Sequence, residues 1–174
     1  MVKETKLRPI RLWLYKVFVK WLPETRLFGL KSALLRWAGA KVGRNVRINS
    51  SATFLGNGAL DIGDDMWVGV ECLFVSSSPA KITIGSHCDI GPRVTFLTGS
   101  HTITPEGEHI GGVGYNSPVT VGSGCWVGAR SLILPGVSIA DKTIVAAGAV
   151  VAKSCGEKCS LIAGVPGKVV KKYV

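Results

Sequence analysis

The sequence predicts an all-β solenoid, a parallel β-helix of about five coils that follows a helical segment and is interrupted by one long loop. Three observations predict this fold. Branched apolar residues recur every six positions over most of the chain, small residues stand close to them, and no helical periodicity follows Trp37. A period of six fits neither an amphipathic helix nor an alternating strand, but it fits a short strand plus a turn, repeated. An α/β sheet would need helical crossovers between its strands.

The repeat is longest in the second half of the chain, where each sixth residue from 121 to 151 is β-branched and aliphatic. Three repeats make one triangular coil of 18 residues, with one branched residue pointing inward on each side. Phe54, Phe74 and Phe96 fall at equivalent positions of three coils, so we expect them to stack along one edge of the core. The predicted inward positions are Val42, Ile48, Phe54, Ile62, Val68, Phe74, Ile84, Ile90, Phe96, Val121, Val127, Ile133, Ile139, Val145 and Val151.

Departures from the period of six predict where loops leave the solenoid. The step from Phe96 to Val121 spans 25 positions, an excess of 19, whereas the other departures add only two or four residues. Residues 97–118 are therefore predicted to form an inserted loop of the domain 41–174. Insertions of this length in repeat proteins usually lie on a functional face. The loop carries two of the three histidines, His101 and His109.

The basic charge of the protein is concentrated at its front end. Residues 1–47 carry twelve Lys or Arg and two Glu, which equals the net charge of +10 of the whole chain, so the remainder is neutral. Such a distribution indicates an attachment or partner surface. Nucleic acid is a poor candidate, because the solenoid offers no basic surface or aromatic platform to bind it.

Residues 1–40 are predicted to form a basic amphipathic helical segment. In its second half, Leu27, Leu30, Leu34 and Trp37 form an apolar stripe, with Lys31 and Arg36 off it. The second half is expected to cap the open end of the solenoid, and two interpretations remain open for residues 1–22: they belong to the cap, or they bind an anionic membrane surface. The apolar run 12–22 is too short and too charged to span a bilayer.

The five cysteines indicate reduced thiols. Their number is odd and no secretory signal is evident, so we expect a cytoplasmic protein, with peripheral association at the inner face of the membrane as an open question. Cys72, Cys88 and Cys125 fall at slim inward positions and are predicted to pack in the core. Cys155 and Cys159 lack the second pair that a zinc site would need.

Three motifs in order carry a resemblance to a known family: "IGPRVTFLTGSH" at 90–101, "CWVGARSLILPGVSIA" at 125–140 and "AGVPGKVVKK" at 163–172. They resemble the hexapeptide-repeat acyltransferases, and within them the galactoside/maltose acetyltransferase and polysaccharide O-acetyltransferase branch. The resemblance covers about residues 40–172. It implies a left-handed β-helix, a homotrimer with active sites between subunits, and acetyl-CoA bound along a groove between coils, with no metal.

The resemblance also implies roles for individual residues. His101 corresponds to the catalytic base, a role that suits an imidazole because it titrates near neutral pH. Asp89, Trp126 and Glu106 are candidates for binding the acceptor. Each has a plainer alternative: a surface position for Asp89, a packing aromatic for Trp126, and a solvated loop carboxylate for Glu106. His109 has no matched position, and His87 is expected in an exposed turn.

Six further residues are candidates for binding coenzyme A. Backbone N–H groups at Gly128 and Ala129 are expected to contact the thioester or its oxyanion. Ala147, one coil later, is a further candidate contact, while Ala140, Ala146 and Ala152 depart from the Gly or Thr usual in the family. Positions equivalent to Lys153, Lys168 and Lys171 bind the phosphates of coenzyme A, although clustered C-terminal lysines can also be simply solubilising.

The predicted function is acetyl-CoA-dependent O-acetylation of a sugar hydroxyl on a surface polysaccharide or its precursor, by direct transfer with His101 as general base. N-acetylation of an amino sugar is an open alternative. A metal hydratase like the γ-type carbonic anhydrases is disfavoured, because it needs three well-placed histidines and the chain has only three in all. A non-catalytic binding scaffold is the third class, and it would release no thiol with any acceptor.

Overall fold

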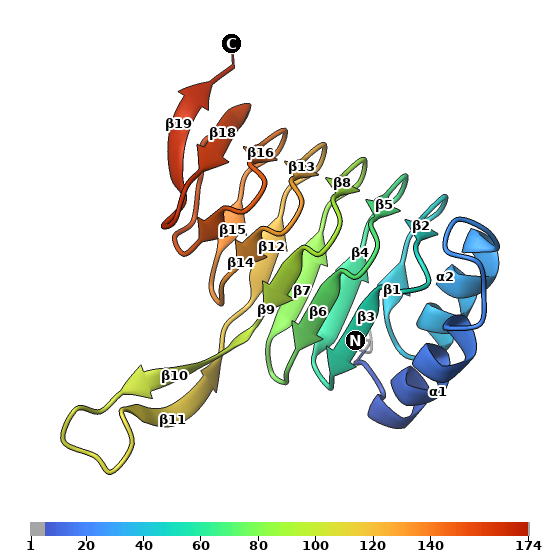
Figure 1. Ribbon diagram of the computed structural model, residues 1–174, viewed down its shortest axis with the longest axis horizontal. Helices are drawn as coiled ribbons and strands as arrows, with labels where there is room; N and C mark the ends of the chain where they lie inside the picture. Colours follow the sequence, from blue (N-terminus) through green and yellow to red (C-terminus); the bar gives the residue numbers. More distant parts are fainter. Residues whose placement is uncertain (1–5, 174) are drawn as a thin grey trace, which may run out of the picture.

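The computed structural model describes residues 6–173. Residues 1–5 of the predicted helical segment and residue 174 lie outside the described part. The chain winds into a solenoid whose coils are stacked along one axis, with two helices at its N-terminal end and a β-hairpin projecting from its side (Figure 1).

Three sheets form the sides of the solenoid, and their strands are parallel except for the last pair, Ser160–Ala163 with Lys168–Lys172, which is antiparallel. Sheet A has the order β1 (Lys41–Val42), β4 (Ala59–Ile62), β7 (Lys81–Ile84), β12 (Val119–Val121) and β15 (Ser138–Ile139). Sheet B has β2 (Arg47–Ile48), β5 (Trp67–Val68), β8 (Asp89–Ile90), β13 (Trp126–Val127), β16 (Ile144–Val145), β18 (Ser160–Ala163) and β19 (Lys168–Lys172). Sheet C has β3 (Thr53–Gly56), β6 (Leu73–Ser76), β9 (Thr95–Leu97), β14 (Leu132–Ile133) and β17 (Val150–Val151). Sheets A and C hold five strands each, so the predicted β-helix of about five coils is confirmed, and β18 begins a further turn.

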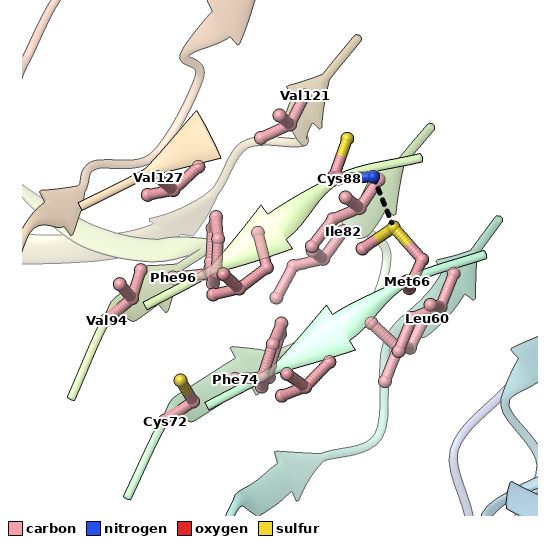
Figure 2. Close-up of a cluster of buried hydrophobic side chains, with 14 of the residues drawn as sticks. Leu60, Met66, Cys72, Phe74, Ile82, Cys88, Val94, Phe96, Val121 and Val127 are labelled. Carbon is pink, nitrogen blue, oxygen red and sulfur yellow. Dashed lines mark hydrogen bonds between the residues drawn. The ribbon is translucent and has the colours of Figure 1, made fainter. Parts of the chain in front are cut away.

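The core is built from two residues of each six: the branched inward residue and the residue two positions before it, as for Phe74 and Cys72. All fifteen inward positions predicted from the repeat are buried, and equivalent positions pair between coils, as Ile84 does with Val121. Phe54, Phe74 and Phe96 stack with successive ring centroids 5.0 Å apart. Figure 2 shows two of these rings between the aliphatic side chains and slim cysteines of the neighbouring strands. The spacing follows from the distance between adjacent strands, about 4.8 Å, because the rings repeat once per coil.

The coil corners use a left-handed backbone at one fixed position, three residues after the inward residue. At the corner after sheet A, Asp65, His87 and Lys142 all have φ between 54° and 60°. A non-glycine residue in this region carries a steric cost, which the ladder on both sides compensates. His87 therefore lies in a turn, where its Nδ1 is 3.7 Å from Oδ2 of Asp65.

The inserted segment differs from the simple loop that the period predicts. It contains an antiparallel hairpin of β10 (Gly99–Ile103) and β11 (Gly111–Asn116), which leaves the solenoid between β9 of sheet C and β12 of sheet A. Pairing satisfies the backbone N–H and C=O groups of a segment that projects into solvent, which an irregular loop would leave to water. Figure 1 shows the hairpin extending well beyond the coils.

Two helices cover the N-terminal end of the solenoid. α1 (Pro9–Val19) packs against α2 and β3, and α2 (Phe28–Trp37) packs against β1 and β2. Leu12, Val19 and Leu35 are buried and extend the core under the helices. Neither helix within the described range is long and apolar enough to cross a membrane.

The predicted apolar stripe of the second helix is wrong. Leu27, Leu30 and Trp37 are exposed, whereas Lys31, expected outside the stripe, is fully buried with Leu35. The reason is a hydrogen-bonding need: the Lys31 ammonium donates to the carbonyl oxygens of residues 23 and 24 at 2.8 and 2.7 Å. These carbonyls belong to the connection between the helices. Desolvation by burial lowers the pKa of Lys31.

Candidate active site

His101 lies in the middle of β10, on the projecting hairpin. It pairs with Gly114 of β11, and its Nδ1 is 3.0 Å from the carbonyl oxygen of Gly112. A Cβ atom added to Gly114 would stand 3.6 Å from Cε1 of the imidazole, so the ring lies across the glycine-rich strand. A side chain at this position would make only ordinary van der Waals contact with the ring.

This contact fixes the tautomer of the neutral imidazole. A carbonyl oxygen can only accept, so Nδ1 carries the hydrogen and donates it. Nε2 is then unprotonated and can accept a proton from a ligand, which is the state that a general base requires. The sequence alone does not indicate this hydrogen-bond partner. Because the acceptor is a backbone carbonyl, which every residue carries, no side-chain pattern indicates it.

Glu106 and His109 lie in the turn between β10 and β11, and both are exposed. The turn is held by Oγ1 of Thr104, which donates to the carbonyl oxygen of His109 at 3.2 Å. The hydrogen bond that orients the His101 ring is therefore made by Gly112 of β11, and the tip of the hairpin presents its carboxylates to solvent.

Asp89 and Trp126 are neighbours on the outer face of sheet B. They pair directly between β8 and β13, and both are exposed, with 58% of the Trp126 side chain accessible. The hairpin leaves the solenoid at the corner between sheets C and A, which is opposite sheet B in a triangular coil (Figure 1). A single chain therefore does not bring Asp89 and Trp126 together with His101.

The backbone amides expected to contact the thioester differ in whether they are already hydrogen-bonded. The Gly128 N–H donates to the carbonyl oxygen of Val145 at 2.7 Å, so the ladder between coils uses it. Within the described residues no acceptor faces the N–H groups of Ala129 and Ala147, which occupy equivalent corners of successive coils. Ala147 is exposed and Ala129 is half-buried. These two amides form a short column of available donors at the corner between sheets B and C.

Two of the three predicted lysines line one pocket. Lys153 and Lys168 border a hollow of about 240 Å³ between the last coil and β19, together with Ser154, Cys155, Ile162, Gly167 and Val169. Lys171 lies further along β19, with its ammonium 4.8 Å from the centroid of the Tyr173 ring. A pocket lined by two lysines together with apolar residues suits an anionic ligand with a less polar body.

A second pocket lies at the other end of the molecule. It has a volume of about 310 Å³ and is lined by Phe28, Gly29, Ser32, Arg36, Asn45, Val46 and Arg47. No residue predicted for the site borders it. The guanidinium of Arg36 is already engaged there, since its Nε donates to the carbonyl oxygen of Val42 at 2.8 Å. We therefore assign this pocket to the packing of the cap.

Most of the cysteines are shielded from ligands in the core. Cys72, Cys88, Cys125 and Cys155 are buried free thiols, and Cys159 is half-buried. Burial raises the pKa of Cys72 to about 11, which disfavours its thiolate near neutral pH. Among residues 6–173 no three His, Cys, Asp or Glu side chains are grouped so that they could hold a metal ion.

Comparison with known proteins identifies the family. Residues 118–153 match the family model described as bacterial transferase hexapeptide (six repeats). The WcaF protein of Escherichia coli (strain K12), named as an acetyltransferase of colanic acid biosynthesis, is 33% identical over 147 residues, which cover 83% of this chain and 77% of the relative. The chain belongs to the hexapeptide-repeat acyltransferases. Galactoside O-acetyltransferase of the same E. coli strain is 28% identical over 82% of this chain and 68% of its own length.

Solved structures of hexapeptide-repeat acetyltransferases have the same fold. A maltose O-acetyltransferase from Clostridium difficile 630 superposes with a TM-score of 0.65 at 24% identity, over 98% of this chain and 87% of that one. A galactoside acetyltransferase in complex with coenzyme A gives a TM-score of 0.64 at 22% identity, over 94% and 79%. This hexapeptide-repeat protein is an acyltransferase.

Proposed function

We propose that this hexapeptide-repeat enzyme transfers an acetyl group from acetyl-CoA to a sugar hydroxyl of a surface polysaccharide or its precursor, with His101 as general base. The observation that carries the proposal is the hydrogen bond from Nδ1 of His101 to Gly112, which leaves Nε2 ready to accept a proton. The relatives named for colanic acid biosynthesis and for galactoside O-acetylation support a sugar acceptor and oxygen as the acylated atom.

The reaction needs one base and donors for one oxyanion. The acceptor hydroxyl oxygen bonds to the thioester carbonyl carbon while its proton passes to Nε2 of His101. The carbon–sulfur bond then breaks, and the imidazolium returns the proton to the thiolate of coenzyme A. The unpaired N–H groups of Ala129 and Ala147 are suited to the acyl and pantetheine part of the donor. Lys153 and Lys168 are suited to its phosphates.

We propose that the active site forms between subunits of a homotrimer. Sheet B and the hairpin lie on opposite sides of one chain, so a neighbouring copy is needed to bring Asp89 and Trp126 to His101. The hairpin also exposes apolar side chains: Ile103, Ile110, Val113 and Tyr115 are each at least 45% accessible. An extended arm of this kind is suited to covering a partner surface.

Because acetyl-CoA is a cytoplasmic metabolite, we propose that the reaction takes place in the cytoplasm, where polysaccharide precursors are assembled. The test is a coenzyme A release assay with a panel of sugars, amino sugars and nucleotide sugars. Acceptor-dependent thiol release with a hydroxyl sugar, and an ester in the product, is the expected result. An amide product with an amino sugar would replace the O-acetyl assignment by the N-acetyl alternative. Release with none of the acceptors, despite tight coenzyme A binding, would favour a binding scaffold.

A further inference from the structure

Helix α1 is apolar on two opposite sides. Its inward side, Leu12, Tyr15 and Val19, is buried against α2 and the first coil. Its outward side and the turn that follows are exposed, with 63% of Trp13 and 84% of Trp21 accessible. The other exposed apolar residues of this side are Ile10, Leu14, Val17 and Phe18.

The two sides are separated by the helical geometry. At 100° per residue, the centre of the exposed apolar side lies about 180° from the centre of the buried side. Capping the solenoid therefore uses one side of α1 and leaves the other without a partner in the described chain. The same helix can therefore both cap the solenoid and bind a membrane surface.

Basic residues border the exposed apolar side. Lys16 and Lys20 are exposed along one margin, and Arg11 lies on the other, where its guanidinium is 4.9 Å from the centroid of the Trp37 ring. Residues 6–23 contain no Asp or Glu. A second copy docking on this surface by two-fold symmetry would bring cations against cations, which is unfavourable. The charge complement of the surface is an anionic partner.

The composition of the surface favours lipid over an acidic protein. Tryptophan, phenylalanine and branched aliphatic side chains on one face, with lysine at its margin, are typical of helices that lie in a bilayer interface. A mainly apolar pocket of about 190 Å³ adjoins the same helix and is lined by Pro9, Leu12, Trp13, Lys16, Phe54, Leu55 and Gly56. Lys16 thus stands beside a hollow that can take part of an apolar chain.

We propose that α1 binds the surface of an anionic bilayer, with its axis parallel to the membrane plane. Phe18 and Trp21 would enter the interface between headgroups and acyl chains, and the ammonium groups of Lys16 and Lys20 would lie near lipid phosphates. The inference goes beyond the proposed acyl transfer and does not depend on it, because it concerns the outward side of the cap and none of the residues assigned to chemistry.

The test is sedimentation of the full chain with vesicles of about three parts phosphatidylcholine to one part phosphatidylglycerol, compared with phosphatidylcholine alone. We expect binding to the anionic vesicles and at least about tenfold weaker partitioning to the neutral ones. The variant Phe18→Ser with Trp21→Ser removes apolar contacts, and Lys16→Gln with Lys20→Gln removes charge. Each pair should weaken binding roughly tenfold or more, since burial of apolar side chains and attraction of lysine to anionic lipid both contribute to binding.

The matched control is Val165→Ser with Val170→Ser, which removes two apolar side chains that are 72% and 59% accessible at the far end of the solenoid. It should bind vesicles like the wild type. Melting temperatures should agree for all variants, because every substituted side chain is exposed. The proposal is overturned if the wild type ignores anionic vesicles at low salt, or if the apolar pair binds as well as the control. Concentration-dependent loss of vesicle binding through self-association would assign the surface to a second copy instead.

Discussion

The imidazole of His101 is held by the backbone of Gly112, with Nδ1 3.0 Å from the carbonyl oxygen across the β10–β11 hairpin. The orienting group is thus a part of the chain that a side-chain substitution cannot remove. The ring itself lies outside the repeat and is exposed, so it contributes nothing to the stacked core. A substitution of His101 should therefore affect catalysis without affecting folding.

We therefore expect His101→Ala to lower kcat by about 10²–10⁴-fold, the usual contribution of a general base, while the melting temperature stays unchanged. Coenzyme A should bind this variant with unchanged affinity in calorimetry. His109→Ala, in the same hairpin but without a matched position, is the control and should retain nearly full activity. A His101→Ala enzyme within about threefold of the wild type on its true acceptor would remove His101 from the mechanism.

The pocket at the last coil predicts where the phosphates of the donor bind. Replacing Lys153 and Lys168 by alanine should raise KM for acetyl-CoA by on the order of tenfold to a hundredfold, because charge-assisted contacts to phosphate contribute about 1.5–3 kcal/mol. The effect on kcat should be small. With acetyl-dephospho-CoA as the donor, the difference in KM between the variant and the wild type should be smaller than with acetyl-CoA. Lys41→Ala, in the first coil, is the control for loss of positive charge; an equal rise in KM there would mean that the pocket is not the phosphate site.

The repeat made the core predictable because the ladder between coils sets its period. Each inward residue pairs with the equivalent residue one coil away, so a pattern of six in the sequence becomes a column in space, as for Phe74 and Phe96. Where the chain leaves the ladder, the pattern carries no such information. The pairing inside the inserted segment depends on contacts across the hairpin, and no period in residues 97–118 indicates it.

The prediction that Lys31 lies outside the buried face of its helix is wrong for a related reason. Amphipathic pattern alone assigns lysine to the outside of a helix, but the connection between α1 and α2 turns two carbonyl oxygens toward this position. Only the tertiary arrangement of the cap creates that need. In the same way, the sequence indicates Asp89, Trp126 and His101 as candidates but does not indicate that one chain holds them on opposite sides.

Truncating one of the stacked phenylalanine rings should greatly reduce the free energy of unfolding. Phe74 contacts a ring on each side, at 5.0 Å between centroids, and is fully buried. Phe74→Ala should reduce the free energy of unfolding by about 3–5 kcal/mol, because it removes the aromatic contacts and leaves a cavity in mid-solenoid. Chemical denaturation followed by circular dichroism measures this change. Leu55→Ala, at a position 43% accessible on sheet C, should cost far less.

Thiol reactivity follows from burial. Four of the cysteines are buried and shielded from reagents, and burial raises the pKa of Cys72 to about 11. A hydrogen bond between Cys88 and Cys125, together with burial, raises the pKa of Cys88, and the same hydrogen bond lowers the pKa of Cys125. Ellman's reagent should modify Cys159, the half-buried thiol, first, and the remaining four only when the protein unfolds. Cys159→Ser should abolish the fast phase. A fast phase that survives this substitution would show that a coil opens in the native state.

The separation of sheet B from the hairpin gives the most direct test of a shared site. If His101 of one subunit works with Asp89 and Trp126 of its neighbour, each site is defined by an ordered pair of subunits. A His101→Ala chain and an Asp89→Ala, Trp126→Ala chain should both be inactive alone. Assembled together at equal amounts, they form about one intact site in four, because each member of an ordered pair is correct half of the time.

Co-expression of the two variants with different tags, followed by purification through both tags, isolates mixed trimers. Every mixed trimer of a three-fold ring contains one ordered pair with both halves intact, so the doubly purified material should recover about a third of wild-type activity. Light scattering on the same sample checks that it is trimeric. Mixing the two purified variants without allowing subunit exchange is the control and should stay inactive. Mixed trimers with no recovered activity would place the whole site within one chain, and a monomeric protein at working concentration would rule out a site of this design.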